Sequence, residues 1–302
     1  MLLEMKDVVK QFGGLTAVSN MSFHVDEGEI YGVIGPNGAG KTTIFNLITG
    51  VYQVTEGDVI FNGQSIEGKK PYQIINLGIA RTFQNIRLFT GMTVLENILV
   101  GVHDRMKSGL LASIIHTASQ QKEEKEACEE AMKLLAFVGL DKDADRLATE
   151  LPYGKQRKLE IARALAANPR FILLDEPFAG VDPIAVIEIQ RIVRFLKERN
   201  IGVLITDHNV RETLSICDHA YIINEGEVLA SGTPDELVND QAELMIYLEK
   251  SDYDWEKIDV GAITPLLDAS FERLGLYADY KHVLGISAYY YTYERLYSSQ
   301  NF

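Results

Sequence analysis

The stretch GPNGAGKTT, residues 35–43, decides the fold class of this chain. It follows the apolar run EIYGVIG (29–35), which predicts a buried strand, and it leads into KTTIFNLITG (41–50), which predicts a helix with Gly50 just past its end. The pattern G-x-x-x-x-G-K-[ST] between a strand and a helix is that of a phosphate-binding loop. The chain is therefore predicted to hold a nucleoside triphosphate at this turn.

The residue types in the loop explain how it would hold phosphate. Glycines let the backbone curl so that its N–H groups face inward, and the helix that starts at Lys41 adds its positive end. Lys41 is expected to reach the β- and γ-phosphates, and the Thr42 hydroxyl is expected to ligate magnesium. We thus predict ATP and Mg²⁺ as cofactors. The predicted nucleotide-binding residues of the loop are Gly35, Pro36, Asn37, Gly38, Ala39, Gly40, Lys41, Thr42 and Thr43.

A second apolar run supplies carboxylates. FILLDEP (171–177) predicts a core strand that ends in Asp175 and Glu176. Asp175 would support magnesium directly or through water, and Glu176 would polarise the attacking water as general base. Adjacent acids after a strand also occur in ordinary turns, so these residues alone leave both interpretations open. The phosphate loop in the same chain favours the catalytic one.

The order of elements predicts an α/β fold with a largely parallel sheet. IGVLITD (201–207) is another core strand, and HAYIINEGEVLASG (219–232) is a hairpin turning at Glu225-Gly226. GDVIFNG (57–63) is typical of an antiparallel strand between turns. TPDELV begins a helix, with Thr233 as cap and Glu236 closing a capping box.

Residues 86–167 carry few strand signals and are predicted to form a helical subdomain inserted in the α/β core. Within 120–138, Cys128, Ala131, Leu135 and Val138 recur at helical spacing opposite a dense Lys/Glu face. That face is expected to be solvated.

Composition excludes several classes of function. The net charge of −14 argues against binding nucleic acid and against docking on anionic lipid by charge alone. No stretch has the roughly 18 uncharged apolar residues that span a bilayer. Charges at Glu4, Lys6 and Asp7 leave the N-terminus without the apolar core of a secretion signal. The two cysteines, too few for a disulfide framework, fit a reducing compartment, so a cytoplasmic location is expected.

With these motifs in place, residues 2–249 resemble the ATP-binding-cassette ATPases. The resemblance implies a P-loop ATPase core with an antiparallel β subdomain. It also assigns roles to further residues: Phe12 would stack on adenine, Gln84 would touch magnesium and sense a membrane partner, and His208 would contact the γ-phosphate. LPYGKQ (151–156) would be the signature loop that closes over the ATP of a second subunit, and Asp182 would lie in the D-loop.

The signature departs from the usual LSGGQ. This chain has Pro152, Tyr153 and Gly154 there, and Pro152 lacks the hydroxyl that normally reaches the opposite γ-phosphate. Proline is tolerated in the first turn of a helix, whose positive end still points at phosphate. We therefore expect a working site without the serine contact, in which Pro152, Tyr153 and Gly154 still meet nucleotide.

The finer resemblance is divided. Residues 1–168 are similar to the ATPases of branched-chain amino-acid importers, and residues 169–240 to the lipopolysaccharide-export ATPase. Because a permease docks on the helical subdomain, the resemblance favours amino-acid import. It implies a dimer, homomeric or heteromeric, held at the inner face of the membrane by permease subunits.

The sequence disfavours two other classes of function. Cassette proteins that act on DNA or ribosomes usually have two cassettes or a long coiled coil before the signature, but only 66 residues separate Gln84 from Leu151 here. A nucleotide-binding regulator that does not hydrolyse ATP is disfavoured by the presence of Lys41, Glu176 and His208.

The expected domains are an ATPase domain over 1–250 and a C-terminal extension over 251–302. The extension holds eight of the 14 tyrosines, which argues against a simple disordered linker. It lies outside the resemblance, and we assign it no function.

Overall fold

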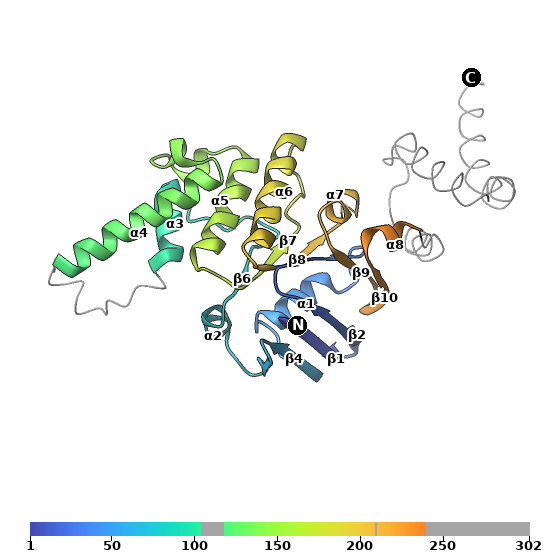
Figure 1. Ribbon diagram of the computed structural model, residues 1–302. Helices are drawn as coiled ribbons and strands as arrows, with labels where there is room; N and C mark the ends of the chain where they lie inside the picture. The colour runs from blue at the N-terminus through green and yellow to red at the C-terminus, as the bar shows by residue number, and fades with distance from the viewer. Residues whose placement is uncertain (104–117, 209, 240–302) are drawn as a thin grey trace, which may run out of the picture. The chain divides into compact units, whose positions relative to one another are not determined.

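The computed structural model describes residues 1–103, 118–208 and 210–239 (Figure 1). Its strands are β1 (Leu3–Phe12), β2 (Leu15–Val25), β3 (Ile30–Ile34), β4 (Glu56–Phe61), β5 (Gln64–Ser65), β6 (Ile79–Arg81), β7 (Phe171–Asp175), β8 (Gly202–Asp207), β9 (His219–Asn224) and β10 (Glu227–Gly232). Its α-helices are α1 (Lys41–Ile48), α2 (Pro71–Asn76), α3 (Val94–His103), α4 (Ala118–Phe137), α5 (Tyr153–Ala166), α6 (Pro183–Glu198), α7 (Val210–Leu214) and α8 (Pro234–Asn239). Two 3₁₀ turns, η1 (Asp141–Asp143) and η2 (Ala148–Glu150), lie between α4 and α5.

The larger sheet runs in the order β10-β9-β3-β8-β7-β6. All its pairings are parallel except that of β10 with β9. Every residue of β3, β7 and β8 is buried, as expected for parallel strands covered on both faces. Because these strands are parallel and adjacent, their carboxyl ends meet at one edge, which places Ile34, Asp175 and Asp207 side by side.

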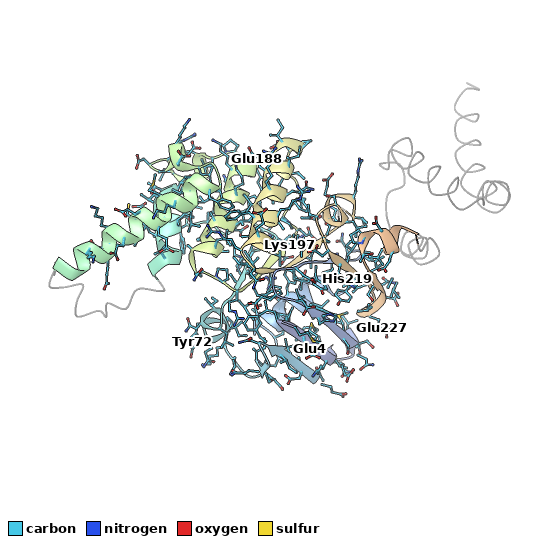
Figure 2. The ribbon with its side chains drawn as sticks, in the orientation of Figure 1. Glu4, Tyr72, Glu188, Lys197, His219 and Glu227 are labelled. Carbon is cyan, nitrogen blue, oxygen red and sulfur yellow. The ribbon has the colours of Figure 1, made fainter. Side chains whose placement is uncertain are left out.

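The smaller sheet is antiparallel, in the order β2-β1-β4-β5. Its inner face and the β3–α1 unit share one apolar core, to which Met5, Phe23, Phe45 and Phe61 contribute. A second core lies between the other face of the large sheet and helices α3 to α6. Charged side chains such as Lys197 of α6 and Glu227 of β10 lie on the surface (Figure 2). Both cores thus anchor the same sheet edge from opposite faces.

The local predictions are confirmed where the structure describes them. Helix α1 ends with Gly50 at φ 70° just beyond its cap, and the turn at Glu225-Gly226 has φ values of 50° and 83°. The capping box is also present, since Thr233 N donates to Glu236 Oε2 at 2.8 Å and Glu236 N donates to Thr233 Oγ1 at 3.3 Å. On α4, Ala131 and Leu135 are buried and Cys128 is half-buried, as the spacing predicted.

Other expectations fall on parts of the chain that are not described. The extension 251–302 and the boundary at 250 lie outside the described residues. In the described part of the chain, none of the helices combines the length and the apolar character needed to cross a membrane.

Candidate functional site

The glycine loop sits between β3 and α1 and is packed tightly against β2 and the β9–β10 turn. Gly38 and Gly40 have φ values of 85° and 105°, which glycine adopts without strain. A Cβ on Gly40 would lie 2.8 Å from the Ala17 carbonyl oxygen of β2. The Ala39 carbonyl accepts a hydrogen bond from Gly226 N at 3.1 Å. The loop conformation is therefore fixed by backbone contacts on both sides.

Lys41 is buried and folds back over this loop. Its Nζ donates to the carbonyls of Gly35 at 2.6 Å and Pro36 at 2.9 Å. Burial lowers the pKa of the Lys41 ammonium, and the nearby carboxylates of Glu176, Asp207 and Asp175 oppose that shift. The carboxylates at the ends of β7 and β8 thus lie within electrostatic reach of the lysine.

Asp175 is buried at the end of β7 and is held at each oxygen. Thr206 of β8 donates its hydroxyl to Oδ1 at 3.1 Å, and Arg81 of β6 donates Nη2 to Oδ2 at 2.8 Å. Arg81 also donates Nη1 to Asn46 Oδ1 of α1 at 2.7 Å. One buried arginine therefore joins the carboxylate to the helix that follows the phosphate loop.

Glu176 occupies a strained position. Its φ is 47°, a left-handed conformation that costs a residue with a Cβ about 1–3 kcal/mol. Its N–H donates to the Thr206 carbonyl at 2.7 Å, which holds the backbone in place. Gln84 donates Nε2 to Glu176 Oε2 at 3.1 Å, and His208 Nδ1 lies 3.6 Å from the same oxygen. His208 Nδ1 is also 3.5 Å from Asp207 Oδ1.

These contacts bring Lys41, Asp175, Glu176, His208 and Gln84 into one site. They tie together the phosphate loop, the ends of β7 and β8 and the segment after β6. Convergent titratable groups of this kind, one of them on a strained backbone, mark a site for chemistry rather than a surface turn.

The donor types fit magnesium. Thr42 follows Lys41 and is exposed, Gln84 offers an amide oxygen, and Asp175 offers a carboxylate. Mg²⁺ takes few ligands from protein, all of them oxygen, and completes its shell with water and substrate phosphate. Among the described residues no cluster of three or more His, Cys, Asp or Glu could hold a metal ion.

Phe12 lies at the end of the β1–β2 hairpin, paired with Leu15. Its ring meets Tyr52 edge-on at 5.0 Å, and Lys10 Nζ lies 5.0 Å from its centre. The same hairpin strand β2 touches the glycine loop through Ala17. Phe12 is thus joined through the hairpin to the strand that borders the loop, and its half-exposed partner Tyr52 lies in the segment after α1.

The residues of the predicted signature loop form a second group at the start of α5. Pro152 is its N-cap, and Tyr153 is its first residue. A Cβ on Gly154 would lie 2.7 Å from Ala185 Cβ and 3.3 Å from Asp182 Oδ2, so α5 and α6 start against each other. Asp182 caps α6 by accepting from the N–H groups of Ile184 and Ala185, both at 3.1 Å.

Several residues that hold the site together are not predicted from the sequence: Arg81, Thr206 and Asp207, which contact Asp175 or His208, and Arg157 and Glu160, which bond to the backbone beside Gln84. Arg81, Thr206 and Asp207 could have been found from the sequence, because each lies at the carboxyl end of a strand in the parallel sheet, at the same end as Asp175. Arg157 and Glu160 lie on α5 and could not, since charged residues on a helix are ordinarily taken to be exposed.

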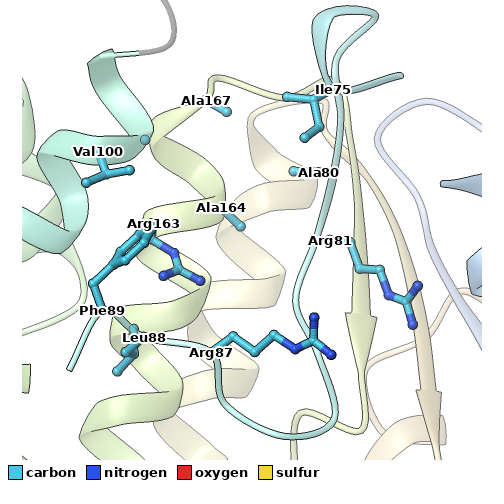
Figure 3. Close-up of a pocket in the computed structure, with 11 residues that line it drawn as sticks. Ile75, Ala80, Arg81, Arg87, Leu88, Phe89, Val100, Arg163, Ala164 and Ala167 are labelled. Atoms are coloured by element: carbon cyan, nitrogen blue, oxygen red, sulfur yellow. The ribbon is translucent and has the colours of Figure 1, made fainter. Parts of the chain in front are cut away.

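A groove of about 760 Å³ lies beside the site, between the segment after β6 and helices α3 and α5 (Figure 3). Arg87, Leu88, Phe89, Val100 and Arg163 are among the residues that line it. The Arg163 guanidinium lies 5.3 Å from the centre of the Phe89 ring. The groove therefore combines apolar surface with positive charge.

The known proteins that this chain is similar to are ATP-binding proteins of transport systems. The family described as ABC transporter matches residues 18–179. The chain is 40% identical over 248 residues to the high-affinity branched-chain amino acid transport ATP-binding protein LivG of Escherichia coli strain K12, covering 82% of this chain and 97% of LivG. It is 39% identical over 246 residues to the lipopolysaccharide export system ATP-binding protein LptB of the same strain, covering 82% of this chain and 96% of LptB.

A solved structure shares the fold. MJ1267, an ATP-binding cassette of an ABC transporter, in its ADP conformation, is similar with a TM-score of 0.71 and 37% identity. The similarity covers 82% of this chain and 98% of MJ1267. The chain is therefore similar both to an ATP-binding protein of branched-chain amino acid transport and to one of lipopolysaccharide export.

Proposed function

The chain belongs to the ABC transporter family and is an ATPase subunit of that family, and from this premise we propose that it powers import of branched-chain amino acids through a separate permease. The observation that carries the hydrolytic part is the convergence of Gln84, His208 and Lys41 on Glu176. The cargo rests on the 40% identity to LivG. Lipopolysaccharide export is the second candidate, because the identity to LptB is 39%.

ATP would be bound through its phosphates, its adenine and its Mg²⁺. The inward N–H groups of residues 35–43 and the start of α1 would hold the phosphates, and Lys41 would exchange its loop carbonyls for phosphate oxygens. The adenine would stack on Phe12. Thr42, Gln84 and Asp175 would hold Mg²⁺, which supplies positive charge against the phosphates when bound.

Hydrolysis would use the held carboxylate of Glu176. Gln84 and His208 both lie against Oε2, which fixes the direction of the carboxyl group. Glu176 would accept a proton from water as the water oxygen bonds to the γ-phosphorus and the bond to the β-phosphate oxygen breaks. His208, next to Glu176, would face the same phosphate.

A dimer would complete the site. The start of α5, with Pro152, Tyr153 and Gly154, would close over the ATP of a second subunit, which can be a copy or a related chain. The half-exposed ring of Tyr153 at the first turn of α5 supports this assignment. Asp182, packed on Gly154, would lie at the same interface.

The groove in Figure 3 would receive the permease. Its apolar wall and its arginines, Arg87 and Arg163, suit an amphipathic helix with an acidic side chain. The chain would then be cytoplasmic and held at the inner face of the membrane through that contact.

Glu176→Gln tests the hydrolytic assignment. The variant keeps the shape of the side chain but cannot take a proton, so the hydrolysis rate should fall by about 100-fold or more while ATP binding persists. The variant should also accumulate as an ATP-bound dimer, measured by size-exclusion chromatography with MgATP.

The chain offers a matched control. Glu225 has the same backbone strain, with φ 50°, but lies exposed in the β9–β10 turn. Glu225→Gln should hydrolyse ATP at the parent rate. Parent turnover in the Glu176 variant, measured by phosphate release, would refute the assignment of the base.

The cargo is tested separately. The chain, purified from membranes with its bound permease and placed in vesicles, should couple ATP hydrolysis to uptake of leucine supplied with the binding protein. Extraction of lipopolysaccharide without amino-acid uptake would assign the second candidate instead.

A further inference from the structure

Two buried charged side chains on α5 form hydrogen bonds with the backbone around Gln84. Arg157 and Glu160 are 0% and 1% exposed, and Arg157 Nη1 lies 2.9 Å from Glu160 Oε2. Arg157 donates to the carbonyls of Phe83 at 2.7 Å and Gln84 at 2.8 Å. Glu160 Oε1 accepts from the N–H groups of Phe83 at 3.3 Å and Arg87 at 3.2 Å. One ion pair thus satisfies backbone groups on both sides of Gln84.

The backbone segment that Arg157 and Glu160 hold is not fixed by regular secondary structure. Residues 82–92 form neither helix nor strand between β6 and α3. The Gln84 amide nevertheless lies 3.1 Å from Glu176 Oε2, a contact that depends on where the backbone of Gln84 is held. Arg157 also donates to Tyr153 Oη at 3.2 Å, so the same guanidinium touches the first residue of α5.

Stability alone is a poor explanation for this pair. Removing two charges from water costs several kcal/mol each, and well-packed apolar residues of similar volume often stabilise a fold as well or better. Burial raises the pKa of the Glu160 carboxyl, and the neighbouring Arg157 opposes the shift. What apolar side chains cannot do is bond to both N–H and C=O groups of an irregular segment.

We propose that Arg157 and Glu160 are positioning residues for ATP hydrolysis, which hold the Gln84 amide against Glu176 by fixing the backbone of residues 83–87. The proposal rests on the proposed role of Glu176 as general base. Arg157 and Glu160 do not touch the reacting atoms in this scheme. They act through Gln84, so their loss should lower the rate of hydrolysis and spare the affinity for ADP without Mg²⁺, which does not involve Gln84.

The decisive variant replaces both charges, Arg157→Met with Glu160→Leu, which leaves no unpaired charge in the core. We expect a folded protein whose kcat falls about 10- to 100-fold, because a small misplacement of a positioned group has an effect of that size. The affinity for ADP without Mg²⁺, measured by calorimetry, should stay within about threefold of the parent. A parent kcat would overturn the proposal, and so would a parallel loss of kcat and of this ADP affinity.

Two further variants keep the test decisive if the double variant unfolds. Arg157→Lys keeps the charge but cannot fork to two carbonyls, so it should show a milder fall in kcat with the parent affinity for ADP without Mg²⁺. If it loses folding or this ADP binding together with kcat, the pair is structural and the proposal is wrong. Glu188→Gln on α6 is the control, because it removes the charge from the 2.7 Å ion pair with Lys158, which follows Arg157 on α5, and leaves residues 83–87 untouched (Figure 2). This variant should keep the parent kcat.

A double-mutant cycle tests the route through Gln84. In a Gln84→Ala background the contact with Glu176 is already gone, so removing the ion pair should cause almost no further loss of kcat. A full second loss in that background would contradict the proposal. If Glu176→Gln hydrolyses ATP at the parent rate, the proposed function fails. If Glu176→Gln is inactive and the ion-pair variant is not impaired, only this inference fails.

Discussion

Gly226→Ala is a severe test of how the phosphate loop is held. Gly226 is the second residue of the β9–β10 turn, with φ 83°. A Cβ there would lie 2.8 Å from the Ala17 carbonyl oxygen and 2.9 Å from Val18 Cα, both backbone atoms of β2. The Gly226 N–H is also the donor to Ala39 in the loop. The methyl group must therefore move the turn, β2 or the loop.

The magnitude follows from two contributions. A left-handed residue with a Cβ costs about 1–2 kcal/mol. Forcing a methyl group against packed backbone costs about 1–3 kcal/mol more, giving a total loss of about 2–5 kcal/mol in the free energy of unfolding. Gly63 isolates the first contribution, since it holds the same position in the β4–β5 turn with φ 76° and a Cβ there would meet nothing within 4 Å. Gly63→Ala should therefore lose only about 1–2 kcal/mol.

Urea unfolding of the two variants and of the parent measures the difference. MgADP affinity should fall several-fold in Gly226→Ala, because the displaced turn pulls on the loop, and should be unchanged in Gly63→Ala. Equal destabilisation in both variants would refute the packing argument. Parent MgADP affinity in a destabilised Gly226→Ala would refute the link between turn and loop.

Two more predictions concern single side chains. His208→Ala removes a group 3.6 Å from Glu176 Oε2 and should lower kcat about 10- to 100-fold with MgADP affinity kept, as phosphate release and calorimetry can show. Hydrogen bonds from Lys155 and, to a smaller extent, from Arg146 hold the pKa of Asp143 below its ordinary value. The stabilisation that the charged Asp143 gives the fold is present above about pH 4 and is lost as the pH falls through the folded-state pKa. Asp143→Asn should thus cost about 1 kcal/mol of unfolding free energy at pH 7. The difference from the parent should shrink as the pH falls below about 4, which urea unfolding over a series of pH values measures.

The phosphate loop and the strand ends could be predicted because their information is local. Glycines at fixed spacing, a buried strand before them and a helix after them determine the loop from a dozen neighbouring residues. Asp175 was predicted because β7 is an unbroken apolar run and its carboxyl end is where ligands bind in parallel sheets. The edge shared with β8 could have added Asp207 by the same reasoning.

The β1–β2 pair was harder, because its side chains do not alternate regularly between the two faces. The register shifts three times along β1, and Asp7 has a φ of 47°. Such bulges break the period of two that identifies a strand in sequence. Arg157 and Glu160 were missed for another reason, since their partners are backbone groups more than 70 residues away, which no side-chain pattern encodes.

The proline in the signature is easier to understand from the start of α5 than from the missing serine. Pro152 is the N-cap with φ −55° and ψ 151°, and in the described structure no side chain caps this helix. A serine cap would accept a bond from the N–H groups of the first turn, whereas proline leaves those donors to an anion that approaches the helix. Gly154 is held against Ala185 of α6, so the first turn of α5 cannot move without moving the start of α6. In the proposed dimer, this proline would shift the contact with the opposing phosphate from a hydroxyl to backbone amides and would keep the helix start in place.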